Sequence, residues 1–144
     1  MARIRDFLVG AAPVGPDVSG SVVFDRFQNE PHTLAIAVVD EDMRPLGLVE
    51  RNAFTLKMAA EFGRALYARR PISALMDLSP LTLEGETEAE DLFRTVDAGG
   101  LGGLLSGFIV TEQGRYAGVG SGVQVLQAAG ALARRRADEM ASLA

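Results

Sequence analysis

The sequence contains no cysteine, and it has a single histidine among its 144 residues. Without cysteine the chain forms no disulfide, thiolate zinc site or thiol nucleophile, and this composition fits a reducing compartment such as the cytoplasm. The one histidine, His32, follows a proline in a segment that reads as a loop, and no catalytic motif accompanies it. We therefore expect a cytoplasmic protein that is not an enzyme, with no catalytic residue and no metal site.

Long hydrophobic runs and an excess of positive charge are also missing. No stretch reaches the roughly 18 apolar residues that a membrane-spanning helix needs, so we expect no membrane partner. The N-terminal segment begins with basic residues, but Asp6 interrupts its short apolar run, and we expect no signal peptide. The formal net charge of −5 disfavours nucleic acid as a partner, and the basic clusters at 69–70 and 134–136 read as solvated helix faces.

The composition nevertheless provides enough apolar material for a core. Hydrophobic residues make up 48% of the chain and charged residues 23%, a balance that is typical of globular domains rather than of disordered chains. The length suits one compact domain or two small, closely joined halves.

The first half of the chain is predicted to contain a helix, two strands and a second helix. The first helix spans residues 18–30 with Asp17 as its N-cap. β-rich runs at 33–40 and 46–50 flank a turn and predict a hairpin. The second helix spans residues 52–68 with Asn52 as its N-cap, and its apolar face consists of Phe54, Met58, Phe62 and Leu66.

The second half is predicted to repeat this order after a linker. Pro71 ends the preceding helix, and the apolar residues that follow it predict one short turn. Strands are predicted at 81–87, 104–110 and 116–120, and helices at 88–100 and from Val123 onward.

A direct comparison supports an internal duplication. Residues 38–54 align without gaps to residues 109–125, at an offset of 71 positions. Four aligned pairs are identical: Val39/Val110, Glu41/Glu112, Arg44/Arg115 and Gly47/Gly118. Together with the repeated element order, these identities predict two structurally similar halves.

The glycine-rich stretch "GRYAGVGSG" at 114–122 raises the question of a phosphate-binding loop. The dinucleotide-binding pattern G-x-G-x-x-G fails here, because Val123 stands where the third glycine belongs. We interpret the stretch as the second copy of a strand-to-helix junction whose first copy is "GLVERNAF" at 47–54. A tight turn with a helix cap remains the structural alternative for its glycines and Ser121.

With these segments in view, the chain resembles a tandem CBS-domain pair, or Bateman module. The resemblance covers about residues 12–130 and rests on "ISALMDLSPLTLEGETEAEDLFRTV" at 72–96, "AIAVVDEDMRPLGLVERNAF" at 35–54 and "AEFGRALYARRPISALMD" at 60–77. It implies an α+β fold of two tandem β-α-β-β-α repeats in a pseudo-twofold module with a C-terminal helix. The expected domains are residues 1–70 for the first repeat with its N-terminal extension, 71–130 for the second, and 131–144 for a helical tail.

The resemblance also implies a ligand. Members of the family bind adenine nucleotides or related molecules between their repeats, through a motif of glycine, two apolar residues, Ser or Thr, two variable residues and Asp. In the copy that begins at Gly47, Glu50 replaces the hydroxyl and Ala53 the acid, and the carboxylate of Glu50 would repel a phosphate unless it is paired. The copy that begins at Gly118 keeps the hydroxyl as Ser121.

We therefore place the expected site in the second copy, where Ser121 contacts a phosphate and Gln124 the ribose. The expected ligand is an adenine nucleotide (AMP, ADP or ATP) or S-adenosylmethionine. By the same resemblance, Pro80, Leu81, Phe108 and Ile109 are the strand residues expected to form the base pocket. The remaining expected ligand-binding residues are Gly120, Gly122 and Arg51.

Two functions follow from the resemblance. In the first, the chain is a regulatory ligand-sensing module of bacterial signalling that works as a homodimer and passes its state through the dimer helices to an output domain or protein. In the second, it is a ligand-free dimerisation and spacer module. The C-terminal segment reads as an exposed helix that leads into an output domain, and we expect the chain to be a fragment of a longer protein.

Overall fold

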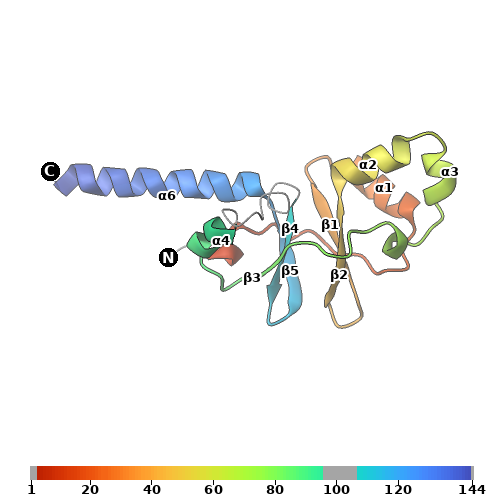
Figure 1. Cartoon of the computed structure of the whole chain (residues 1–144), viewed down its shortest axis with the longest axis horizontal. Helices are drawn as coiled ribbons and strands as arrows, with labels where there is room; N and C mark the ends of the chain where they lie inside the picture. The colour runs from red at the N-terminus through yellow and green to blue at the C-terminus, as the bar shows by residue number, and fades with distance from the viewer. Residues whose placement is uncertain (1–2, 96–106, 144) are drawn as a thin grey trace.

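The computed structural model describes residues 3–95 and 107–143, which form two small sheets, flanking helices and one long C-terminal helix (Figure 1). The first half contains η1 (Ile4–Phe7), α1 (Gly20–Asn29), β1 (Ala35–Val39), β2 (Pro45–Glu50), α2 (Arg51–Ala59), α3 (Gly63–Tyr67) and η2 (Ile72–Ala74). The second half contains β3 (Thr82–Glu84), α4 (Ala89–Thr95), β4 (Phe108–Glu112), β5 (Arg115–Gly120) and α6 (Gly122–Leu143). The predicted element order is confirmed. Parts of the helix predicted at 88–100 and the strand predicted at 104–110 lie outside the described residues.

The two halves share one strand arrangement. β1 and β2 form an antiparallel hairpin, as do β4 and β5, and β3 runs parallel to β4. In the first half, Val14 forms a single parallel bridge to Val38, beside β1 in the place that β3 takes beside β4. The first strand of the first repeat is thus reduced to one bridge, which explains why periodicity in the sequence did not reveal it.

The register of the hairpins corrects the gap-free alignment of the two halves. Val38 lies opposite Gly47, and Val110 lies opposite Gly118, with an irregularity in the ladder directly after each pair. Val38 therefore corresponds to Val110 and not to Ile109. The cause is a first hairpin turn one residue longer than the second, so the identities at Arg44/Arg115 and Gly47/Gly118 hold but those at Val39/Val110 and Glu41/Glu112 do not.

The helix predicted at 52–68 is broken in two. Phe62 has a left-handed backbone (φ 62°) between α2 and α3, and a β-carbon on Gly63 would overlap the carbonyl oxygen of Lys57. The break turns the second half of the predicted apolar face outward. Phe54 and Met58 are buried, whereas the side chains of Phe62 and Leu66 are 70% and 50% exposed.

The N-caps also differ from the prediction. The side chain of Ser19, and not Asp17, accepts from the backbone N–H of Val22 at the start of α1. Glu50, and not Asn52, caps α2. Both caps stand directly before their helices, where a side-chain acceptor satisfies the first free N–H groups.

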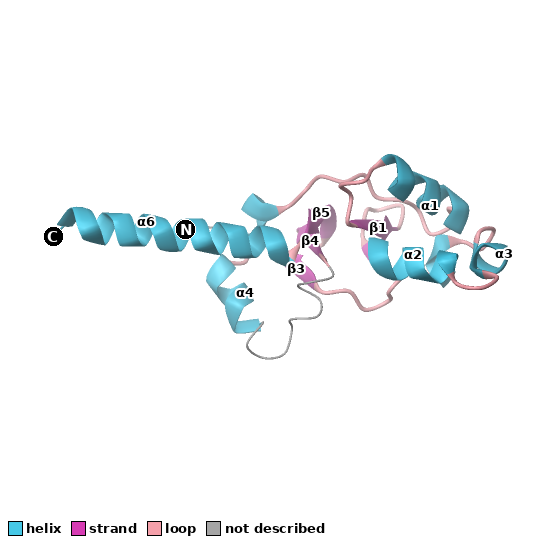
Figure 2. Cartoon of the chain, turned by 90° about the horizontal axis from the view of Figure 1, so that it is seen from above, coloured by secondary structure: helices cyan, strands magenta, loops and turns pink. Residues whose placement is uncertain are grey.

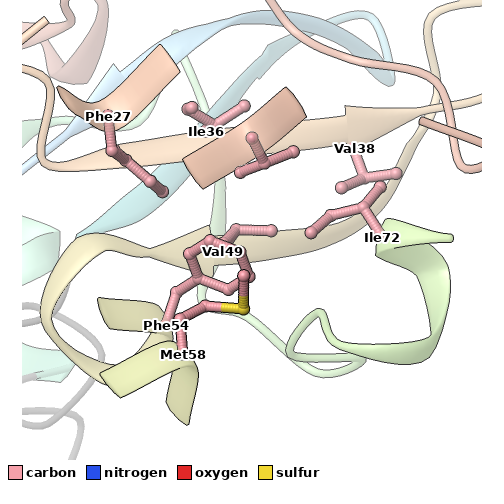
Figure 3. Packing of buried hydrophobic residues seen from close by; sticks show 8 residues of the cluster. Phe27, Ile36, Val38, Val49, Phe54, Met58 and Ile72 are labelled. Carbon is pink, nitrogen blue, oxygen red and sulfur yellow. The ribbon is translucent and has the colours of Figure 1, made fainter. Parts of the chain in front are cut away.

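The core consists of one apolar cluster in each half and a third between the sheets. The first-half cluster gathers Phe27, Ile36, Phe54, Met58, Ile72 and their neighbours between the hairpin and its helices (Figure 3). The second-half cluster consists of Ile4, Leu92, Phe108 and Val110. The third joins Ala35, Ala37 and Leu48 of one sheet to Ile109 and Val119 of the other, so the two hairpins pack against each other at the centre of the molecule (Figure 1).

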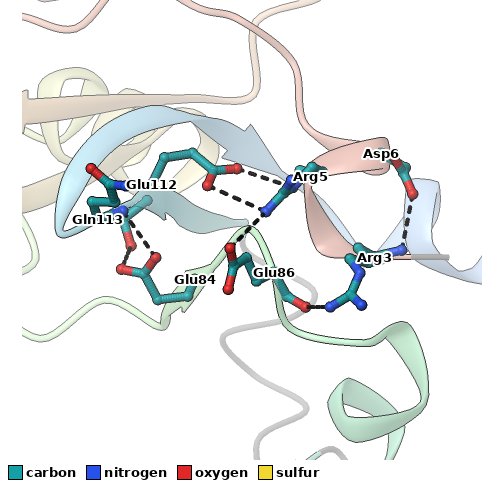
Figure 4. A network of polar contacts seen from close by, with 8 residues as sticks. Arg3, Arg5, Asp6, Glu84, Glu86, Glu112 and Gln113 are labelled. Atoms are coloured by element: carbon teal, nitrogen blue, oxygen red, sulfur yellow. Dashed lines mark hydrogen bonds and ion pairs between the residues drawn. The ribbon is translucent and has the colours of Figure 1, made fainter. Parts of the chain in front are cut away.

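A polar network ties the N-terminal segment and β3 to the second hairpin (Figure 4). The carboxylate of Glu84 accepts from the hydroxyl of Thr111 at 2.7 Å and from the backbone N–H groups of Gln113 and Gly114 at 3.2 and 3.1 Å. Arg5 pairs with Glu112 at 3.2 Å. The hydrogen bond from Thr111, followed by those from the turn amides, lowers the pKa of Glu84 below its ordinary value of 4.5.

This lowered pKa predicts an acid-dependent contribution to stability. A depressed pKa in the folded state means that the Glu84 carboxylate stabilises the fold above its ordinary pKa, and that this contribution is lost as the pH falls through the lowered value. We expect Glu84→Gln to lower the denaturation midpoint at pH 7, and the difference from wild type to shrink below about pH 4.5. Urea denaturation across this pH range measures it, with Glu41→Gln in the exposed first hairpin turn as the control. An equal difference at pH 3 and pH 7 would contradict the assignment.

The helix predicted from Val123 onward is confirmed as α6, which projects away from the rest of the molecule (Figure 2). Residues 133–142 are exposed, and one described ion pair, Arg136 to Glu90 at 3.2 Å, joins α6 to α4. None of the described helices has the length and apolar character to cross a membrane.

Candidate ligand cavities

Two cavities of similar size lie at corresponding places in the two halves. The β5 cavity has a volume of about 320 Å³ and is lined by Val9, Ala11, His32, Thr33, Leu34, Ala35, Gly107, Val119, Gly120 and Ser121. The β2 cavity has a volume of about 340 Å³ and is lined by Leu48, Val49, Glu50, Ala53, Phe54, Lys57, Leu75, Met76 and Asp77. Both volumes are in the range of small-molecule sites.

The two cavities are built in the same way. In each, the second strand of a hairpin forms an antiparallel bridge to a segment from elsewhere in the chain. Leu48 and Asp77 exchange two backbone hydrogen bonds at 3.1 and 2.8 Å, and Val119 and Val9 exchange two at 3.0 and 2.7 Å. Each cavity lies between this bridge and the junction at which the strand ends and the next helix begins.

In the β2 cavity, the carboxylate of Glu50 is bound to its own helix. One oxygen accepts from the backbone N–H of Asn52 at 3.0 Å and the other from that of Ala53 at 2.7 Å. These amides at the start of α2 are the groups that would receive a ligand phosphate. The carboxylate is therefore paired with two backbone amides. It occupies the position at the start of α2 where the phosphate of a ligand would bind.

The β5 cavity has a hydroxyl where the β2 cavity has this carboxylate. Ser121 ends the strand-to-helix junction at 6% exposure, and Gly120 and Ser121 both line the cavity. Gly122 begins α6. Gln124 lies in the first turn of that helix, and its side chain lies outside the described part of the structure.

Gly120 lines the β5 cavity, and packing against its neighbours also requires a glycine at this position. A β-carbon built on it would lie 2.5 Å from Cζ of Phe108. The phenyl ring of Phe108 thus lies directly beneath the strand, and it is fully buried in the second-half cluster.

The structure does not bring the predicted base-pocket residues to the β5 cavity. Phe108 faces the second-half cluster and Ile109 the cluster between the sheets, and both are fully buried. Leu81 packs against the second-half cluster, and the carbonyl of Pro80 accepts from the hydroxyl of Thr82 at 3.3 Å. Among the described residues, none of these four lines the β5 cavity. For Phe108 and Ile109 the reason is that successive residues of a buried strand face opposite cores rather than one pocket.

Arg51 is also placed differently from the prediction. Its guanidinium donates to the carbonyl oxygens of Thr33, at 2.7 Å, and Glu30. The guanidinium carbon lies 4.8 Å from the ring centroid of Phe27. The side chain is therefore bound to the turn before β1, and Arg51 does not itself line the β5 cavity.

Sequence reasoning missed the walls of the β5 cavity. Val9 and Ala11 come from the N-terminal segment, and His32, Thr33 and Leu34 from the turn before β1, far in sequence from Ser121. The hydroxyl of Tyr116 in β5 donates to the carbonyl oxygen of Ala11, and burial raises the pKa of Tyr116. The apolar run at 8–14 was a signal for this segment, but it pairs with the two hairpins only through isolated bridges at Val9 and Val14, which leave no strand periodicity in the sequence.

Solved structures show what this arrangement is similar to. No protein-family model matches the sequence, and no curated protein sequence matches it. The CBS-pair protein CBSX2 from Arabidopsis thaliana matches at 18% identity over 92% of this chain and 97% of that chain, with a TM-score of 0.72. CBS-domain protein ATU1752 from Agrobacterium tumefaciens matches at 23% identity over 88% of this chain and 98% of that chain, with a TM-score of 0.68.

A third match carries ligands. The CBS-domain pair of protein MJ0100, in complex with 5′-methylthioadenosine and S-adenosyl-L-methionine, matches at 13% identity over 91% of this chain and 98% of that chain, with a TM-score of 0.67. CBSX2 has also been solved in complex with AMP, and that structure matches with a TM-score of 0.71. At these identities the similarity concerns the fold, which it covers over most of the chain.

Proposed function

We propose that this chain, which has the fold of a tandem CBS-domain pair, is a regulatory ligand-sensing module that binds an adenine nucleotide or S-adenosylmethionine in the β5 cavity. The observation that carries the proposal is the placement of Gly120 and Ser121 in the wall of a cavity that both halves of the chain build. The module senses rather than catalyses, and it works in the cytoplasm as part of bacterial signalling.

The chemistry of the β5 cavity suits an adenosine derivative. Val9, Ala11, Leu34 and Val119 offer apolar surface for a base. Ser121 and the first amides of α6 offer donors to a phosphate, since the N-terminus of a helix attracts negative charge. The contact of Gln124 with the ribose, which the resemblance implies, stays a prediction. AMP in CBSX2, and 5′-methylthioadenosine and S-adenosylmethionine in MJ0100, are ligands of this class.

Transmission of the ligand state follows from where α6 begins. Gly122 is the first residue of α6 and follows directly on Ser121, so a ligand at the junction contacts the end of a helix whose residues 133–142 are exposed. A change in the pose of α6 would reach an output domain or partner protein attached to it.

A second candidate is a ligand-free homodimerisation and spacer module. It is favoured by exposed apolar side chains on α2 and α3 and at the break between them, where Leu56, Phe62 and Leu66 are 72%, 70% and 50% exposed. Large exposed apolar groups on neighbouring helices are typical of protein interfaces. Dimerisation also belongs to the sensing proposal, so the two candidates differ only in the ligand.

A thermal-shift experiment separates the two candidates. AMP at about 100 times its dissociation constant adds roughly 2.7 kcal/mol to the unfolding free energy, which raises the melting temperature by several degrees. We expect this shift in the wild type, a smaller one in Ser121→Ala, and the full shift in the control Ser142→Ala near the exposed end of α6. ADP, ATP and S-adenosylmethionine are compared in the same way. No shift with any of them, alongside a dimer by light scattering, would support the spacer.

A further inference from the structure

The turn between α1 and β1 forms one wall of the β5 cavity, through His32, Thr33 and Leu34. The turn is held partly by Glu30. The carbonyl oxygen of Glu30 accepts from the backbone N–H of Thr33 at 3.0 Å. Its carboxylate accepts from the hydroxyl of Thr33 at 3.0 Å and from the guanidinium of Arg26 at 2.9 Å.

Arg51, the first residue of α2, holds the same turn from the other side. Its Nε donates to the carbonyl oxygen of Thr33 at 2.7 Å, and a terminal nitrogen donates to the carbonyl oxygen of Glu30. Its backbone N–H donates to the carbonyl oxygen of Leu34 at 2.8 Å. The guanidinium also lies over the ring of Phe27. This ring is buried, and stacking on it holds the plane of the guanidinium.

We infer that Arg51 is a positioning residue for the β5 cavity: it fixes the turn that forms the cavity wall, so that a ligand meets a preformed surface. The inference rests on the proposed function. A wall that is already ordered spares the ligand the entropy cost of ordering it. The planar guanidinium bonds two carbonyl groups at once, which the single ammonium group of a lysine cannot do in the same geometry.

The position of Arg51 also links the two junctions of the duplicated fold. Glu50 caps α2 in the β2 cavity, and the next residue, Arg51, supports the wall of the β5 cavity. The first junction, whose own phosphate-binding amides are filled by Glu50, thereby contributes to the cavity at the second junction.

The test compares Arg51→Lys with a matched control, Arg64→Lys. The guanidinium of Arg64 lies 4.8 Å from the ring centroid of Phe24, as that of Arg51 does from Phe27. Both substitutions therefore remove a stacked guanidinium, but only one alters the turn. In Arg51→Lys we expect the dissociation constant for AMP, measured by calorimetry, to rise about tenfold.

A second readout needs no ligand. Amide hydrogen exchange at residues 32–34 should be about tenfold faster in ligand-free Arg51→Lys than in wild type, because the turn opens more often. Arg64→Lys should match wild type in both measurements. If the stacked guanidinium serves stability alone, both variants should have a lower melting temperature than wild type and an unchanged affinity for AMP.

The outcomes separate this inference from the proposed function. If Arg51→Lys binds AMP as tightly as wild type, the inference fails while the proposed function stands. If the wild type binds none of AMP, ADP, ATP and S-adenosylmethionine, the proposed function fails and the inference fails with it. Should Arg51→Lys not fold, Glu30→Gln loosens the same turn from its other side, and an unchanged affinity for AMP in that variant overturns the inference.

Discussion

The Phe108→Ala variant is expected to lose about 3–5 kcal/mol of unfolding free energy, the usual cost of truncating a fully buried phenylalanine. The ring of Phe108 has no exposed surface and packs with Ile4, Leu92 and Val110. Its removal leaves a cavity that the surrounding strands fill only partly. Urea denaturation measures the loss, and the control Leu78→Ala, whose parent side chain is 73% exposed, should change stability by less than about 0.5 kcal/mol.

This variant also decides between two roles for Phe108. The resemblance to CBS pairs assigned it to a base pocket, whereas the structure places it in the second-half cluster. A variant that keeps wild-type stability but binds AMP more weakly would return Phe108 to the ligand site and contradict the packing described above.

The Gly120→Val variant is expected to lose both stability and ligand binding. A β-carbon at this position would lie 2.5 Å from Cζ of Phe108, so the ring and the strand must separate. Overpacking of this kind costs typically 1–3 kcal/mol. Because Gly120 also lines the β5 cavity, the branched side chain and the displaced strand should weaken AMP binding by at least about tenfold, or 1.4 kcal/mol.

Gly15→Val is the matched control for this substitution, because a β-carbon on Gly15 meets no atom within 4 Å. Denaturation and calorimetry on both variants separate the two effects. Wild-type affinity for AMP in a folded Gly120→Val protein would show that the ligand site lies elsewhere.

The sequence predicted most elements because each depends on local patterns. The β-rich run at 33–40 predicted β1, and the segment from Val123 onward predicted α6. The resemblance to CBS pairs then supplied the arrangement of the halves, which local patterns do not contain. The predicted domain boundaries at residues 70 and 130 stay a prediction.

Features that depend on distant contacts could not be predicted in this way. The break before Gly63 arises because the chain at this residue packs onto the carbonyl groups at the end of α2. The extra residue in the first hairpin turn became visible only when both registers were known. Glu50 was recognised as a departure from the family motif, but its role as a cap required the two amide bonds to be seen.

The candidate site was predictable only in part, for the same reason. Ser121 and Gly120 belong to a motif that is continuous in sequence, and the structure places both in the wall of the β5 cavity. The opposite wall comes from Val9, Ala11 and the turn before β1, which reach the cavity through tertiary packing. Phe108 and Ile109, which the resemblance made base-pocket candidates, follow the alternation of a strand buried on both faces, so their side chains pack into two different cores.

The number of AMP molecules bound per chain at saturation tests the central claim most directly. The β5 cavity has a hydroxyl and a helix terminus to receive a phosphate, whereas Glu50 fills the corresponding amides of the β2 cavity. Isothermal titration calorimetry of the wild type should therefore give one AMP per chain, bound at least about tenfold more weakly in Gly120→Val. Two AMP molecules per chain would contradict the claim that Glu50 closes the β2 cavity to phosphate, and no binding of AMP, ADP, ATP or S-adenosylmethionine would contradict the sensor itself.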